Sequence, residues 1–161
     1  MTATQPPTVR PASSADAAQL AHVHRISRAV TMPYLPPQVR DHQEVTRWFE
    51  EVVLPTSRVW VAVRGDQVLG YAALKGDVLE QLYLRPEVRR RGIGTLLLDE
   101  VRRHSPGGLS LRVFQWNTDA RAFYAHHGFR LLATSDGHGP EGNMERLPDA
   151  TLRWPGRAGA A

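Results

Sequence analysis

Apolar residues near the N-terminus recur at helical spacing in two segments. The first segment follows a pair of possible capping residues, Ser13 and Ser14, and contains the apolar positions Leu20, Val23, Ile26 and Val30. Spacings of three and four residues place side chains on one face of a helix. We therefore expect a helix there, preceded by a short strand at residues 8–10.

The second segment has the clearest helical pattern in the chain. Asp41 and Glu44 have the Asp-x-x-Glu spacing of a helix start. The apolar positions that follow are Val45, Trp48, Phe49, Val52 and Val53. This spacing predicts a helix with one apolar face, separated from the first by a stiff loop at residues 29–38 that contains three prolines.

The pattern then changes to strands. The segments 58–64, 67–74 and 78–84 are rich in β-branched and aromatic residues and are separated by Gly-Asp turns. Further along, the pattern predicts a helix at 92–104, a strand at 109–113, a helix at 117–128, and strands at 129–133 and 149–154. Residues 134–143 form a glycine-rich loop, and no internal repeat is present.

Length and composition indicate one globular domain. The chain has 161 residues, of which 42% are hydrophobic and 22% charged, which suits a single core. We expect the domain to span residues 1–161, with a core at about 8–154 and a flexible tail at 155–161. No segment approaches the ~18 apolar residues of a membrane span, so we expect a cytoplasmic protein without a membrane partner.

The chain has no cysteine, which excludes disulfides, thiolate metal sites and a cysteine nucleophile. Seven histidines are present, but His22 and His24 do not share a helical face, and no HExxH motif occurs. We therefore expect no metal.

The net charge of +4 comes almost wholly from arginines scattered over the chain, with no nucleic-acid-binding motif. We therefore expect no nucleic-acid partner.

Three of these arginines stand together in the sequence RRRGIG, residues 89–94. Glycines between a strand and a helix let backbone N–H groups approach a ligand, and the helix start adds partial positive charge. The segment therefore predicts a phosphate site, although a solvated arginine cluster at a helix start is the simpler alternative. A dinucleotide fingerprint is excluded by Leu97, and a Walker loop is excluded because Lys75 is the only lysine.

The segment LEQLYLRPEVRRRGIGTLLLDEV, residues 79–101, resembles the acetyl-CoA signature of the GCN5-related N-acetyltransferase (GNAT) family. Its pattern, Arg/Gln-x-x-Gly-x-Gly/Ala, is filled by Arg89, Gly92 and Gly94. NTDARAFYAHHGF, residues 117–129, resembles the second family signature. The resemblance covers about residues 8–133 and implies an α/β (α+β) fold with a mixed, mostly antiparallel central sheet of six to seven strands flanked by four helices.

The resemblance also implies which residues bind acetyl-CoA. Residues that would hold the pyrophosphate by backbone amides and positive charge are Arg89, Arg90, Arg91, Gly92, Ile93, Gly94 and Thr95. Residues that would contact the pantetheine arm are Leu82, Tyr83, Leu84 and Asn117.

Two residues carry the implied chemistry. Tyr124 matches the family tyrosine that protonates the departing thiolate, a mild step because a thiol pKa of ~8.5 lies below that of tyrosine, ~10. The alternative for Tyr124 is a plain core residue. Glu80 shares a strand face with Leu82 and Leu84 by period two and could accept the proton of an ammonium substrate, directly or through water. Because family members differ in the position of this base, a water chain is the alternative to Glu80.

The expected acceptor site is formed by the proline-rich loop, Trp48 and the loop at 136–145. Its predicted substrate-binding residues are Met32, Tyr34, Glu141, Asn143 and Glu145, beside Asp136 and His138. Carboxylates in that loop would favour a cationic amine, and an ordinary surface loop is the alternative.

The expected activity is acetyl transfer from acetyl-CoA to a primary amine, by direct attack in a ternary complex. The expected partner is a small amine or an amino-acid-like molecule. A protein N-terminus or lysine is the alternative acceptor, and an acyl-CoA sensor without turnover is the alternative function. The sequence leaves open the acceptor, the use of other acyl-CoAs, and whether the protein is a monomer or a homodimer.

Overall fold

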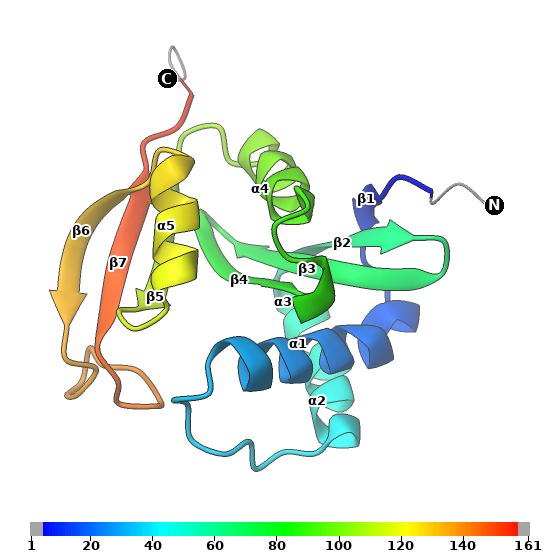
Figure 1. The fold of residues 1–161 in the computed structure, drawn as a ribbon, viewed down its shortest axis with the longest axis horizontal. Helices are drawn as coiled ribbons and strands as arrows, with labels where there is room; N and C mark the ends of the chain where they lie inside the picture. The colour runs from blue at the N-terminus through cyan, green and yellow to red at the C-terminus, as the bar shows by residue number, and fades with distance from the viewer. Residues whose placement is uncertain (1–4, 158–161) are drawn as a thin grey trace. The chain divides into compact units, whose positions relative to one another are not determined.

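The computed structural model describes residues 5–157, which belong to two compact units, Met1–Arg103 and His104–Ala161 (Figure 1). The described elements follow the predicted order and contain seven strands, so the predicted α/β class is confirmed. The expectation of one domain over the whole chain stays a prediction. Most of the predicted tail lies outside the described residues. None of the helices in the described part of the chain is long and apolar enough to cross a membrane.

The first unit combines four strands with four α-helices. Its strands are β1 (Thr8–Pro11), β2 (Arg58–Arg64), β3 (Gln67–Lys75) and β4 (Val78–Leu84). Its helices are α1 (Ala17–Thr31), α2 (His42–Trp48), α3 (Leu54–Thr56) and α4 (Ile93–Arg103). Shorter turns are the 3-10 segments Ser14–Asp16 and Pro86–Val88 and the π-helical segment Phe49–Val53. The strands are antiparallel in the order β1-β2-β3-β4.

The predicted capping residues start the second helix, but its course differs from expectation. Asp41 accepts a hydrogen bond of 2.8 Å from the Glu44 N–H, as the Asp-x-x-Glu spacing predicts. Beyond Trp48 the chain makes a π-helical turn before α3. A π turn changes the angular position of the residues after it. Val53 is therefore only 4% exposed, whereas Val52, predicted on the same apolar face, is 47% exposed.

Helices cover both faces of this sheet. α1, α2 and the π-helical turn place Leu20, Val23 and Phe49 in one cluster with Val61 and Tyr71 of β2 and β3. α4 contacts β2, β3 and β4, and Figure 1 shows it on the side of the sheet opposite α1. The buried residues of α4 are Ile93, Gly94, Leu97, Leu98 and Val101. Burial of these branched side chains on both faces is the main stabilising contribution.

The second unit contains three strands and one helix. Its elements are β5 (Leu109–Phe114), α5 (Thr118–His126), β6 (Arg130–Ser135) and β7 (Asp149–Trp154). β7 lies between β5 and β6 and is antiparallel to both, which confirms the predicted final strand. Gly128 has φ +87° directly after α5, so the predicted helix-ending glycine is also confirmed.

Candidate active site

The segment from Arg85 to Gly92 links β4 to α4 through a tight turn. The backbone N–H of Arg85 donates to the Leu69 carbonyl at 2.8 Å, and its guanidinium Nε donates to the Val68 carbonyl at 2.6 Å. Val88 is 5% exposed and holds the middle of the turn in the core. The end of β4 and the start of α4 are therefore fixed relative to β3.

Two residues in this segment have left-handed backbone conformations, Arg90 with φ +65° and Gly92 with φ +83°. Glycine adopts such angles at no cost, but an arginine there costs about 1 kcal/mol. Strained residues of this kind often lie at ligand sites, where they orient backbone groups. The strain at Arg90 therefore supports a binding role for the segment.

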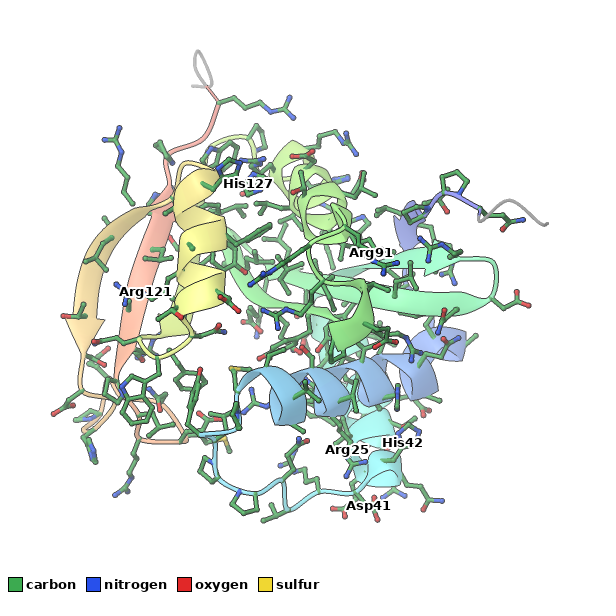
Figure 2. All side chains as sticks on the ribbon, in the orientation of Figure 1. Arg25, Asp41, His42, Arg91, Arg121 and His127 are labelled. Atoms are coloured by element: carbon green, nitrogen blue, oxygen red, sulfur yellow. The ribbon has the colours of Figure 1, made fainter. Side chains whose placement is uncertain are left out.

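The N-terminus of α4 is a suitable place for an anion. The Leu96 N–H makes the first i to i−4 hydrogen bond, to the Gly92 carbonyl at 3.1 Å, so the amides of Ile93 and Gly94 precede the helical ladder. A Cβ added at Gly92 would meet nothing within 4 Å, so the space above this residue is open. Arg90 and Arg91 are exposed, and Figure 2 labels Arg91 on this turn. These residues fit the phosphate groups of coenzyme A.

β4 brings the predicted pantetheine-binding residues directly before this turn. Leu82, Tyr83 and Leu84 are all partly buried. Opposite them, a Cβ at Gly70 would lie 2.5 Å from Leu84 Cδ2 and 2.8 Å from the Tyr83 carbonyl oxygen. Glycine at position 70 therefore lets β3 approach this part of β4 closely.

A bulge in β4 corrects the predicted position of Glu80. Ala73 pairs with Gln81 and Leu74 pairs with Leu79, which leaves Glu80 as the extra residue of β4. A bulge interrupts the alternation of side chains. Leu79 therefore pairs on the face of Leu82 and Leu84, and simple alternation no longer assigns Glu80 to that face. Glu80 is exposed rather than desolvated, and its role as a base stays a prediction.

The second unit carries the predicted tyrosine and asparagine on one helix. Asn117 Oδ1 accepts a hydrogen bond of 3.3 Å from the Ala120 N–H and so caps α5. Tyr124 is 7% exposed, and its ring lies 5.2 Å from the centroids of both Phe123 and Phe129. The burial fits either a core tyrosine or a proton donor shielded from water.

The predicted acceptor residues of the first unit differ in accessibility. Tyr34 and Trp48 are partly exposed. Met32 is 3% exposed, so its side chain is part of the interior and would have to move to touch a substrate.

The loop after β6 is organised by a buried acid that sequence reasoning missed. Asp149 is 4% exposed, forms an ion pair of 2.9 Å with Arg112, and accepts hydrogen bonds from Ser135 Oγ and Asn143 Nδ2. Asn143 also donates to the Leu147 carbonyl at 2.7 Å and accepts from the Leu147 N–H at 3.1 Å. Its amide therefore holds the loop closed, although it was predicted to bind substrate.

The carboxylates of this loop have different environments. Glu141 is exposed, and its backbone carbonyl accepts a hydrogen bond of 2.7 Å from Arg112. Asp136 accepts the His138 N–H at 2.9 Å in a local turn. Glu145 is partly exposed. The substrate roles predicted for Glu141 and Glu145 stay predictions.

A polar network inside the first unit was also not predicted. His24 Nδ1 lies 3.0 Å from the hydroxyl of Tyr71, which donates to Gln81 Oε1 at 2.5 Å. Burial, and then the nearby Arg28 guanidinium, lower the pKa of His24 to about 4. Nothing in the sequence around His24 indicates that its ring contacts side chains of strands that lie far along the chain. Within residues 5–157, no three His, Asp or Glu side chains are grouped to hold a metal.

Comparison with known proteins relates these features to a family. A family model described as "Acetyltransferase (GNAT) domain" matches residues 55–131, which include the turn before α4 and α5. The peptidyl-lysine N-acetyltransferase YiaC of Escherichia coli is 30% identical over 108 residues, which is 65% of this chain and 68% of that protein. The chain belongs to the GNAT acetyltransferase family. The predicted family is thereby confirmed.

Other acetyltransferases are also similar to this chain in sequence or structure. The peptidyl-lysine N-acetyltransferase YjaB of Salmonella typhimurium is 36% identical over 91 residues, 54% of this chain, and the chain spans only 62% of that relative. The apo-form solution structure of YjaB from Escherichia coli covers 95% of this chain and is itself covered completely, with a TM-score of 0.74 and 24% identity. yncA of Salmonella typhimurium, solved with its cofactor acetyl-CoA, has a TM-score of 0.70 at 21% identity, with 96% of both chains covered. These structural likenesses establish a GNAT fold.

Proposed function

We propose that this protein transfers the acetyl group of acetyl-CoA to the primary amine of a small, amino-acid-like molecule. The observation that carries the proposal is the turn before α4, where left-handed Arg90 and Gly92 leave open space beside a helix N-terminus in a GNAT chain. Backbone amides and arginine side chains there suit a pyrophosphate. Because the chain belongs to the GNAT family, acetyl-CoA is the pyrophosphate-containing molecule to test first.

The reaction is a direct transfer in a ternary complex. The neutral amine nitrogen attacks the thioester carbonyl carbon, a C–N bond forms, and the C–S bond breaks. The departing sulfur takes a proton, which we assign to the Tyr124 hydroxyl. The proton that the amine nitrogen releases passes through water to the resulting phenolate and restores Tyr124. The products are an amide and free coenzyme A thiol. No covalent enzyme intermediate is needed, in keeping with a chain that has no cysteine.

The chain's own residues perform four tasks in this proposal. The amides of Ile93 and Gly94 and the arginines before them bind the phosphates, and the backbone of Leu82 and Leu84 orients the pantetheine arm. Tyr124 is buried, so its proton is kept for the thiolate rather than exchanged with bulk water. Exposed Glu80, or a water molecule in its place, accepts the proton of the ammonium form of the substrate.

A protein lysine or N-terminus is the second candidate acceptor. The relatives YjaB and YiaC carry the name peptidyl-lysine N-acetyltransferase, which supports a peptide substrate. A sensor that binds acyl-CoA without turnover is the third candidate.

Two measurements separate these candidates. Acetyl-CoA at ~100 times its dissociation constant should raise the free energy of unfolding by ~2.7 kcal/mol, which a rise in melting temperature detects. Thiol release is then measured with a panel of small amines, amino acids and lysine peptides. Stabilisation without thiol release would identify a sensor, and release with peptides alone would identify a protein acetyltransferase. The absence of both effects would contradict the proposal.

A further inference from the structure

One cation on α1 lies among aromatic side chains close to the predicted pantetheine-binding strand. Arg28 Nη1 donates a hydrogen bond of 3.1 Å to the Tyr83 hydroxyl. Tyr83 lies on β4 between Leu82 and Leu84, the residues to which we assign the pantetheine arm. The Arg28 guanidinium is therefore anchored to the strand segment along which the thioester would lie.

Tyr34, in the loop after α1, belongs to the same group. Burial is the main cause that raises the pKa of Tyr34, followed by Tyr83, and the positive charge of Arg28 opposes the rise. The pKa of Tyr34 therefore responds to both Tyr83 and Arg28. We call Arg28, Tyr34 and Tyr83 the Arg28 cluster. All three side chains are partly exposed, but the hydroxyl oxygen of Tyr34 is itself buried, so Arg28 and Tyr83 are the groups that a small molecule can reach.

Neutral aromatic and imidazole rings surround the ring of Tyr83. The rings of His24 and Tyr71 lie 5.5 and 5.9 Å from the ring of Tyr83. His24 is neutral at neutral pH because its pKa is lowered to about 4. Arg28 is therefore the one formally charged group among these five side chains, and it also acts on the pKa values of His24, Tyr34 and Tyr71.

We infer that the Arg28 cluster binds a carboxylate of the acetyl acceptor, so that the substrate is an amine that also bears a carboxylate, as in a free amino acid. A planar guanidinium donates two parallel hydrogen bonds to a carboxylate, and low-dielectric surroundings strengthen the attraction. The phenol hydroxyl of Tyr83 is a further donor for the same oxygens. A second ammonium, as on a polyamine, would be repelled by Arg28.

This inference rests on the proposed acetyl transfer and names the substrate class for that site. The inferred acceptor differs from a peptide substrate, because a lysine side chain inside a protein has no carboxylate close to its amine. The substrate's amine remains cationic before reaction, so the acceptor would be a zwitterion whose carboxylate faces Arg28.

The test uses matched acceptors with the full-length protein. Thiol release from acetyl-CoA is measured with the common α-amino acids, each beside its own α-carboxamide, and with an acetyl-capped lysine peptide. We expect the best acid to have a kcat/KM at least ~10-fold above that of its amide, the size of one charge-assisted hydrogen bond. An equal or higher kcat/KM for the amide or the peptide would overturn the inference while leaving acetyl transfer intact.

Variants then assign the preference to Arg28. Arg28→Gln should lower kcat/KM for the acid by ~10- to 100-fold and bring the acid-to-amide ratio near 1, with the dissociation constant of acetyl-CoA unchanged. Arg47→Gln, on the exposed face of α2, removes the same charge and should leave the ratio unchanged. A ratio that stays high in Arg28→Gln would exclude the cluster as the carboxylate site. Should Arg28→Gln fail to fold, the acid–amide comparison in the unmodified protein still decides the substrate class.

If acetyl-CoA neither stabilises the protein nor releases thiol with any acceptor, the proposed function fails, and this inference fails with it. Binding and turnover with amides or peptides, but not with acids, overturns this inference alone.

Discussion

Asp149 and Arg112 form an ion pair of 2.9 Å in which the carboxylate is buried and the arginine side chain is 48% exposed. The same carboxylate accepts hydrogen bonds from Ser135 and Asn143, which lie near the two ends of the glycine-rich loop. One acid therefore joins β5, the end of β6 and the loop to the start of β7.

We expect Asp149→Asn to lower the free energy of unfolding by about 2–3 kcal/mol, because it removes the charge that satisfies three donors in a buried position. Urea denaturation measures the change. Asp136→Asn alters an exposed acid in the same loop and should change stability by less than ~0.5 kcal/mol. Equal stability of the Asp149→Asn variant and the unmodified protein would show that the network contributes nothing to folding.

Gly92→Glu should abolish stabilisation by acetyl-CoA. The glutamate would place a carboxylate in the open space where we expect phosphate, and position 92 also has φ +83°. Gly76→Glu is a matched control, since Gly76 has φ +63°, equally open surroundings and a place in the β3–β4 turn. Thermal shift with and without acetyl-CoA compares the two variants.

Both variants should lose ~1–2 kcal/mol of stability from backbone strain, but only Gly92→Glu should lose the ligand response. A ligand response retained by folded Gly92→Glu would move the site elsewhere. Gly94→Glu is expected to abolish binding as well, but Gly94 is buried in α4, so that substitution also disturbs packing.

Tyr124→Phe should lower kcat by ~10²- to 10⁴-fold while the affinity for acetyl-CoA changes little. The ring keeps its contacts with Phe123 and Phe129, and only the hydroxyl that protonates the thiolate is lost. Single-turnover kinetics with the identified acceptor measure the chemical step. Full turnover in the variant would make Tyr124 a core residue and water the acid.

A packing control separates the two roles of Tyr124. Phe129→Leu shortens a buried ring neighbour without touching the hydroxyl. We expect a loss of stability by about 1 kcal/mol and a kcat within a few-fold of the unmodified value.

The stability of the protein should fall as the pH is lowered from about 6.5 to about 4, and His24 is the cause. Its pKa is about 4 in the folded protein, below the ordinary value of 6.5, because burial disfavours the charged imidazole. The unfolded chain therefore takes up a proton first, and the contribution of neutral His24, about 3 kcal/mol at neutral pH, is lost across this window.

His24→Gln should flatten this pH dependence of the free energy of unfolding between pH 4 and 6.5. His126→Gln, at an exposed position of α5, should leave it in place. Urea unfolding at several pH values provides the comparison. An unchanged slope in His24→Gln would assign the pH dependence to other groups.

Local sequence patterns were enough to predict most helices and strands of this protein. They also singled out the segment Arg89–Thr95. Helical spacing, the Asp41–Glu44 start and the Gly-Asp turns are local signals, and the elements that they predict are present because these signals depend on residues close in sequence. The segment Arg89–Thr95 was equally predictable, since glycines before a helix define a local backbone shape. These signals also identified the family.

Tertiary structure alone decided which side chains meet. The bulge at Glu80 depends on how β4 pairs with β3, so alternation along one strand is not enough to place this residue. The π turn after Trp48 exposes Val52, although the helical pattern predicted it on the buried face. Asn143 holds its loop through Asp149, and Arg28 meets Tyr83, because distant parts of the chain are brought together by packing of the core. Sequence spacing describes neighbours along the chain, whereas burial and charge at these sites arise from neighbours across the fold.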